Sequence, residues 1–135
     1  MSNEPVGVAV ALLLKRGRVL MGERKAGKIY PLHWEFPGGK IEAGETPVEA
    51  LRRELQEELL IGVHDAELWH SEIATYSNGI TYAISYFLVR TWDGIIIDRE
   101  FNRTDWISQK AIPTLLHLSG NATILDRLMR EGIPK

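Results

Sequence analysis

The chain begins with an apolar run, Val6 to Leu14, in which hydrophobic residues follow one another without helical spacing. A charged break with one glycine, Lys15-Arg16-Gly17-Arg18, separates this run from a second apolar stretch, Val19 to Met21. Short apolar runs bounded by turn residues are typical of buried strands, whereas helices repeat apolar residues every three or four positions. The pattern therefore predicts two strands joined by a tight turn.

Glycine and proline are frequent in residues 22–44, so we expect mostly loop there, with one short strand around Trp34 to Phe36. The spacing then becomes helical, because apolar residues recur at Val48, Leu51, Leu55 and Leu59. A capping box and a proline at the first helical position precede this stripe, in the order Thr46-Pro47-Val48-Glu49. We predict a helix that begins at Thr46 and carries this apolar stripe.

Two β-prone runs, Ala66 to Tyr76 and Ile80 to Trp92, flank Ser77-Asn78-Gly79, and Asn-Gly is a strong hairpin signal. Asp93-Gly94 marks another turn before three isoleucines. Near the C-terminus, residues 121–130 carry apolar side chains at helical spacing, after a capping asparagine and before Gly132. Strands on either side of helices, with adjacent hairpins, predict an α/β fold: a mixed sheet covered by two helices.

A chain of 135 residues with 44% hydrophobic residues suits one domain, which we expect to span 1–135. Lysine and arginine number 16 against 18 acidic residues, so a net charge of −2 provides no broad attraction to DNA, RNA or acidic membranes. We expect neither a nucleic-acid polymer nor a membrane as partner. The absence of cysteine excludes disulfides, thiolate zinc sites and a cysteine nucleophile.

The N-terminal residues do not follow the pattern of a signal peptide, which has a basic region before a long apolar one. The longest apolar run, Val8 to Leu14, is far too short to span a bilayer. Cytoplasmic localisation is therefore the expectation. Composition leaves the choice between a monomer and a homodimer open.

Three glutamates of the predicted helix, Glu54, Glu57 and Glu58, stand at i, i+3 and i+4 and fall within an arc of about 100°. Like charges at this spacing repel one another, and a divalent cation would offset that repulsion. Magnesium prefers hard oxygen ligands and commonly joins one or two carboxylates to substrate phosphates. The alternative is a solvated acidic face with no ligand.

The segment before the helix, Phe36-Pro37-Gly38-Gly39-Lys40, favours the metal site over the solvated acidic face. Gly39, Glu45, Arg53-Glu54-Leu55, Glu57-Glu58 and Ile61 together resemble the signature of the Nudix hydrolases. One position departs from it, because Leu60 stands where the family has a glycine that lets the chain leave the helix, and Gly62 is the candidate to end the helix instead. The signature covers residues 39–61, and the order of the flanking elements resembles the family's α/β/α sandwich.

The resemblance implies a role for each matching residue. Glu54, Glu57 and Glu58 match the glutamates that bind metal and position water, and the Gly38 carbonyl matches a backbone metal ligand. Arg53, which we include in the catalytic set, and Glu45 match a pair that holds loop and helix together. Lys40 is placed to meet phosphate. The implied cofactor is Mg²⁺, with Mn²⁺ as the alternative.

The longer string from Trp34 to Thr46 looks like the MutT branch of the family, whose members remove 8-oxo-dGTP or hydrolyse CTP and related nucleotides. Glu100 matches a loop glutamate that joins the metal cluster, and Asn121 matches an amide that reads the oxidised purine. Arg24 matches a residue of the nucleotide pocket, and we group Phe36 with it. The plainer alternatives are a solvated Glu100 and an Asn121 that only caps the last helix.

These matches predict Mg²⁺-dependent hydrolysis of a nucleoside triphosphate to its monophosphate and pyrophosphate, above all of 8-oxo-dGTP. One alternative is a CTP, dCTP or general nucleotide pyrophosphohydrolase, which is favoured because residues 77–80 lack the aromatic and arginine positions expected for an 8-oxoguanine site. The other alternative is a noncatalytic nucleotide sensor. Retention of all three helix glutamates argues against the sensor. We interpret His33, His64, His70 and His117 as structural or surface residues, and Trp69, Trp92 and Trp106 as core.

Overall fold

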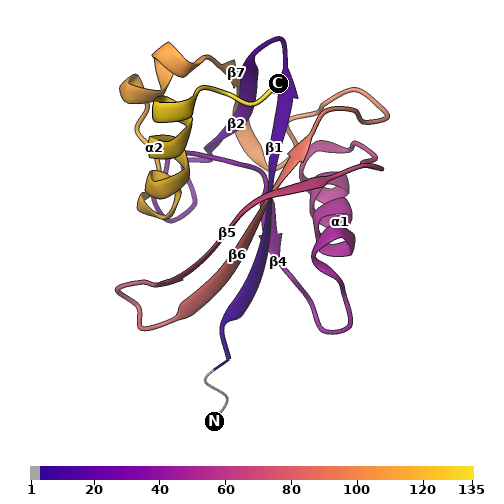
Figure 1. The fold of residues 1–135 in the computed structure, drawn as a ribbon, viewed down its shortest axis with the longest axis vertical. Coiled ribbons are helices and arrows are strands. Elements are labelled where there is room, and N and C mark those ends of the chain that lie inside the picture. Colours follow the sequence, from indigo (N-terminus) through magenta and orange to yellow (C-terminus); the bar gives the residue numbers. More distant parts are fainter. Residues whose placement is uncertain (1–3) are drawn as a thin grey trace.

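A seven-stranded mixed sheet forms the middle layer of residues 4–135, which are the residues that this computed structural model describes (Figure 1). The strand order is β3-β2-β1-β6-β5, while β4 pairs with β1 and β7 pairs with β2. The strands are β1 (Val6–Lys15), β2 (Arg18–Arg24), β3 (Trp34–Glu35), β4 (Gly38–Lys40), β5 (Glu67–Thr75), β6 (Thr81–Val89) and β7 (Phe101–Ile107). Helices α1 (Pro47–Leu59) and α2 (Ala122–Glu131) lie on opposite faces of this sheet (Figure 1).

Strand β1 lies at the centre of the sheet, which explains why its sequence is continuously apolar. It pairs in parallel with β6, from Val6 opposite Tyr82 to Leu13 opposite Val89, while its pairs with β2 and β4 are antiparallel. Successive side chains of a strand point to opposite faces. Leu12 and Leu14 accordingly join the core under α2, and Ala9, Ala11 and Leu13 join the core under α1. The expected α/β/α sandwich with a mixed sheet is confirmed.

Helix α1 begins as its sequence predicts. Thr46 Oγ1 accepts a hydrogen bond from the Glu49 amide, and the Glu49 carboxylate accepts one from the Thr46 amide, which completes the capping box. Its buried stripe consists of Ala50, Leu51, Leu55 and Leu59.

The end of α1 differs from the expectation. Leu60 adopts the left-handed conformation itself, with φ 58° and ψ 35°, so the proposal that Gly62 takes over as terminator is wrong. The amide and the carbonyl of Gly62 are instead bonded to the backbone of Asp93. The chain therefore leaves the helix at the position where the family has glycine, at the cost of a left-handed leucine.

The predicted hairpin is present as β5 and β6, with Gly79 at φ 80° and Asn78 Oδ1 accepting from the Ile80 amide. One strand was not predicted and another only in part. Strand β4 lies inside the segment expected to be loop, and of β7 only the stretch around Trp106 was interpreted as part of the core. Both depend on pairing with distant partners, β1 and β2, which short-range patterns do not reveal.

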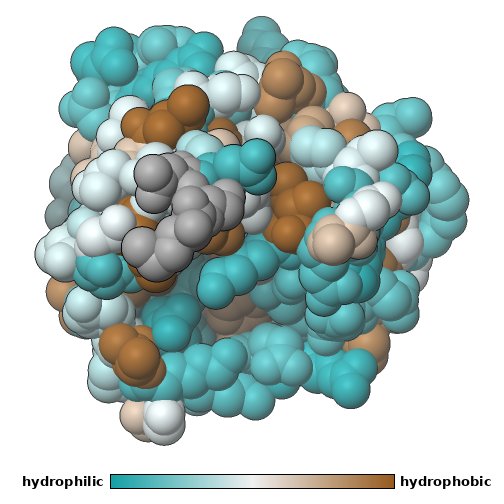
Figure 2. Space-filling model, turned by 90° about the horizontal axis from the view of Figure 1, so that it is seen from below, coloured by the Kyte–Doolittle hydropathy of each residue, from teal (hydrophilic) through white to brown (hydrophobic). Residues whose placement is uncertain are grey.

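Helix α2 buries Ile124, Leu125 and Leu128 against the sheet, as its spacing predicts. Asn121 stands at the N-cap position, yet its side chain makes no capping hydrogen bond, so the interpretation of Asn121 as a side-chain cap is wrong. Within residues 4–135, neither helix has the length and apolar composition needed to cross a bilayer. Seen from below, the surface is largely hydrophilic, with hydrophobic residues in separate groups (Figure 2).

Candidate active site

Four carboxylates and one ammonium group line a cavity of about 320 Å³, formed by Lys28, Glu54, Glu57, Glu58 and Glu100. Three of the glutamates come from one face of α1, as their spacing predicts. Glu100 precedes β7 and comes from a distant part of the chain. The structure thus brings together all four glutamates that the sequence selects, and it adds a lysine.

The open C-terminal end of α1 positions Glu100. The last carbonyls of a helix lack partners within the helix, and here the amides of Ile97 and Arg99 donate to the carbonyls of Leu59 and Glu58, at 3.0 and 3.2 Å. These two bonds fasten the segment before β7 to the helix end. Glu100 therefore faces the helix glutamates because it follows the capping segment directly.

Arg53 connects the helix to the loop that precedes it. Its Nε and Nη2 donate to the two carboxylate oxygens of Glu45 at 2.8 and 3.0 Å, and Nη2 also donates to the Lys40 carbonyl at 3.0 Å. Its Nη1 donates to Glu54 Oε1 at 2.9 Å and lies 3.5 Å from Glu57 Oε2. The expected ion pair with Glu45 is present, and this guanidinium also holds Glu54 in place. The hydrogen bond from Arg53 keeps the pKa of Glu45 below its ordinary value.

Strand β4 supplies two glycines that the site needs for steric reasons. Gly38 has φ 148°, and a β-carbon there would collide with the backbone of Ala9. A β-carbon on Gly39 would collide with the carboxyl group of Glu54. The Gly38 amide donates to Glu58 Oε2 at 3.2 Å. The Gly-Gly pair therefore lets the sheet and the acidic face of α1 approach each other.

Glu58 is the carboxylate whose protonation is most perturbed. Burial raises the pKa of Glu58 to about 9, aided by the neighbouring carboxylates of Glu54 and Glu35 and opposed by the hydrogen bond from Gly38. Burial of Glu58 therefore favours the protonated form of its carboxyl group at neutral pH.

The donor set suits a hard divalent cation, since carboxylate oxygens surround the cavity and part of their charge is uncompensated. Within residues 4–135, no group of three or more histidine, aspartate or glutamate side chains is arranged so that it could hold a metal ion by itself. Glu54 is held by Arg53, and the side chain of Glu57 is 57% exposed. Substrate oxygens and water would complete such a coordination shell, as magnesium sites commonly require.

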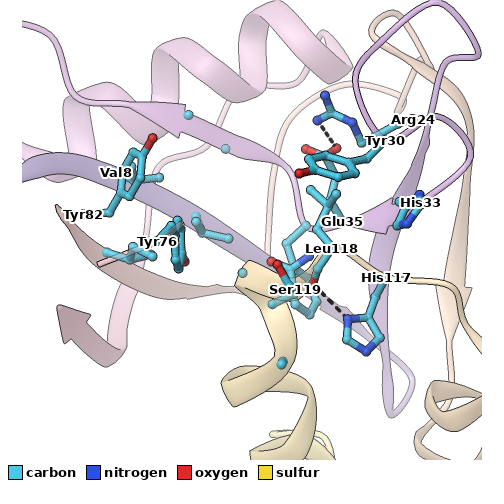
Figure 3. Close-up of a pocket in the computed structure, with 18 of the residues that line it drawn as sticks. Val8, Arg24, Tyr30, His33, Glu35, Tyr76, Tyr82, His117, Leu118 and Ser119 are labelled. Carbon is cyan, nitrogen blue, oxygen red and sulfur yellow. Dashed lines mark hydrogen bonds and ion pairs between the residues drawn. The ribbon is translucent and has the colours of Figure 1, made fainter. Parts of the chain in front are cut away.

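Figure 3 shows a second cavity, of about 870 Å³. Gly38 and Gly39 line it while contacting the glutamates of the acidic cavity. Tyr76 and Tyr82 lie at one end, with ring centroids 5.1 Å apart. At the other end Arg24 Nη1 donates to Glu35 Oε2 at 2.7 Å. Aromatic walls with a few polar groups are typical of sites for small organic ligands.

Most of the residues expected to bind nucleotide line one of the two cavities, but one does not. Arg24, Phe36 and Asn121 all line the large cavity, whereas Lys40 lines neither cavity. Asn121 Nδ2 makes one long contact, 3.5 Å from the Trp34 carbonyl oxygen, so most of the hydrogen-bonding capacity of its amide remains available. The position of Asn121 is compatible with reading a ligand, and its proposed capping is not observed.

Sequence reasoning missed several residues of the two cavities. Lys28, Glu35, Tyr76 and Tyr82 were not selected, although the apolar-polar alternation of the hairpin could have placed the two tyrosines on one face. His33 and His117, which we interpreted as structural or surface residues, line the large cavity. The tryptophans Trp69, Trp92 and Trp106 pack against the two cores as expected.

The model of the NUDIX domain family matches residues 3–128 of the chain. A relative described as 8-oxo-dGTP diphosphatase, from Haemophilus influenzae, is 33% identical over 132 residues, which cover 97% of this chain and 96% of that protein. An RNA pyrophosphohydrolase from Francisella philomiragia is 37% identical over 99 residues, covering 73% of this chain but only 59% of its own length. The solution structure of the E. coli ORF135 protein superposes with a TM-score of 0.82 at 26% identity, over 94% of this chain and 90% of that one.

Proposed function

The chain belongs to the NUDIX family, and from this premise we propose that it hydrolyses a nucleoside triphosphate to its monophosphate and pyrophosphate. One observation carries the proposal: an acidic cavity and a cavity with aromatic walls meet at the Gly38-Gly39 pair. The acidic cavity suits metal-bound phosphates, and the larger one has the size of a nucleoside site. A triphosphate can occupy both.

We assign Mg²⁺ to the carboxylates of Glu54, Glu57, Glu58 and Glu100, together with the Gly38 carbonyl as the backbone ligand that the family resemblance implies. When bound, magnesium neutralises phosphate oxygens and lowers the pKa of water. Mn²⁺ offers the same chemistry to the same donors. The protein contributes fixed positions for these ligands, which is where positioning and electrostatic stabilisation of a phosphoryl-type reaction originate.

The remaining work falls to the protein's own side chains. Arg53 holds Glu54 and Glu45 through charge-assisted hydrogen bonds, so the helix and the preceding loop keep a fixed relation during turnover. The exposed Glu57 is accessible to water and can orient the attacking molecule or accept its proton. No covalent intermediate is needed, because water attacks a phosphorus atom directly and pyrophosphate leaves.

We propose 8-oxo-dGTP as the preferred substrate, since the H. influenzae diphosphatase is similar over nearly its whole length. Asn121 would offer a donor and an acceptor to the oxidised base from the wall of the large cavity. A general nucleotide or CTP pyrophosphohydrolase is the second candidate. It is favoured by residues 77–80, Ser-Asn-Gly-Ile, which bring neither an aromatic ring nor an arginine to the cavity.

The decisive experiment is a screen of purified protein with magnesium against 8-oxo-dGTP, dGTP, CTP, dCTP and nucleoside diphosphate derivatives. Pyrophosphate and phosphate are measured separately, because release of pyrophosphate distinguishes this reaction from stepwise removal of phosphate. Added chelator should abolish turnover, and excess magnesium should restore it. Turnover that survives thorough metal removal would exclude the mechanism.

A further inference from the structure

The segment between β2 and β3 forms part of both cavities. Lys28 lines the acidic cavity, and the very next residues, Ile29 and Tyr30, line the larger one. The segment is held at its base, because Arg24 Nε donates to the Ile29 carbonyl at 2.8 Å and the Leu32 amide donates to the Arg24 carbonyl at 3.0 Å. Figure 3 shows Tyr30 beside the Arg24–Glu35 pair. Lys28 therefore lies at the junction of the two cavities.

Lys28 provides the one positive charge among the described residues that line the acidic cavity. Its Nζ lies 3.9 Å from Glu100 Oε2, and the two side chains are 47% and 45% exposed. An ion pair of that length and exposure is weak and easily exchanged. The ammonium group is thus positioned near carboxylates without being committed to one of them.

We propose that Lys28 binds a phosphate of the nucleotide, exchanging Glu100 for a phosphate oxygen when a divalent cation neutralises the carboxylates. This inference rests on the proposed function. A nucleotide with its base in the large cavity and its phosphates in the acidic one would have those phosphates in the cavity that Lys28 lines. Lysine is a common phosphate ligand, since its compact charge carries three donors on a flexible stem.

The exchange has a consequence for metal binding. In the absence of nucleotide, the Lys28 ammonium and a bound cation repel each other within one cavity. Removal of this charge should therefore leave the affinity for magnesium alone unchanged or increase it, while weakening the binding of triphosphate. A lysine that served only to hold Glu100 in place would give the opposite metal result, because its loss would disorder a ligand.

The test uses Lys28→Gln, Lys28→Arg and a charge control, Lys110→Gln, in the 3-10 helix Gln109–Thr114 at a position outside both cavities. Calorimetry measures binding of Mg²⁺ alone, and then of α,β-imido-dGTP and of deoxyguanosine in the presence of Mg²⁺. We expect Lys28→Gln to bind the imido triphosphate about 10- to 100-fold more weakly, as for a lost charge-assisted hydrogen bond, with deoxyguanosine unchanged. Lys28→Arg should restore most of the affinity, and Lys110→Gln should match the wild type.

Equal loss of triphosphate and nucleoside affinity would assign Lys28 to loop structure and overturn the proposal, and so would weaker binding of magnesium alone. Wild-type affinity of Lys28→Gln for the imido triphosphate would also overturn it. The nucleotide screen separates these failures from failure of the proposed function. If the wild-type protein hydrolyses no nucleotide, the proposed function is rejected. If it hydrolyses nucleotides and Lys28→Gln binds the imido triphosphate as tightly as the wild type, only the role of Lys28 is rejected.

Discussion

The backbone of Gly39 lies directly against the carboxyl group of Glu54, with no room for a β-carbon between strand β4 and helix α1. We therefore predict that Gly39→Ala displaces Glu54 and lowers kcat by at least about 100-fold, comparable to the loss of a group that stabilises the transition state. Gly27→Ala is the matched control, because a β-carbon there meets nothing within 4 Å. Steady-state kinetics with near-normal kcat for Gly39→Ala would show that the contact is unimportant.

Glu58 should make the stability of the metal-free protein depend on pH. Its folded-state pKa is about 9 against an ordinary 4.5, so the folded protein keeps a proton that the unfolded chain loses within this interval. Stability should therefore fall as pH rises from about 4.5 to about 9. We predict that metal-free Glu58→Gln is more stable than wild type at pH 8, by about 1–3 kcal/mol, and that the difference shrinks towards pH 5.

Urea unfolding in chelator at several pH values measures this difference. Magnesium should stabilise the wild type at pH 8 more than the glutamine variant, because binding to the folded state alone raises its stability. If the two proteins show parallel stability curves in chelator, Glu58 is not protonated as its surroundings require. Glu57→Gln, at a position whose side chain is 57% exposed, serves as the comparison variant.

Leu60 has a left-handed backbone that costs about 1–2 kcal/mol in a residue with a side chain, and the residue is 38% exposed. Glycine removes this strain but loses about 0.5–1 kcal/mol of backbone entropy. We predict that Leu60→Gly stabilises the protein by about 0.5–1 kcal/mol and leaves kcat unchanged. Leu60→Ala keeps the strain and loses packing, so it should destabilise; thermal melts of both variants decide the matter.

The residues of α1 show why part of this architecture could be predicted. The capping box of Thr46 and Glu49, the buried leucines and the shared face of the three glutamates are all properties of one helix, written within a few residues of each other. The left-handed Leu60 was not predicted, because nothing local distinguishes a strained leucine from a helix that continues to Gly62.

Long-range contacts explain what local patterns missed. Lys28 meets Glu100 only because the amides of Ile97 and Arg99 bind carbonyls at the end of α1. Strand β4 consists largely of glycine, which has low strand propensity, and becomes a strand by pairing with β1. Asn121 makes no capping bond because its backbone is already helical, with φ −93° and ψ −4°, whereas a side-chain cap normally has an extended backbone.

Asn121 permits the sharpest test of the substrate, because its side chain lines the large cavity and makes no capping hydrogen bond. Asn121→Ser and Asn121→Asp should therefore change the free energy of unfolding by less than about 0.5 kcal/mol. Serine lacks the paired donor and acceptor of the amide, and ionised aspartate lacks the donor, so a buried base edge would lose a partner at a cost of about 1–3 kcal/mol. We predict that the ratio of kcat/KM for 8-oxo-dGTP over dGTP is high in the wild type and falls about 10-fold or more in both variants, with melting curves as the stability control. A wild-type ratio near unity would remove the oxidised-guanine assignment, whereas a high ratio unchanged by either substitution would leave base recognition to other residues of the cavity, of which Tyr76 and Tyr82 are the nearest aromatic pair.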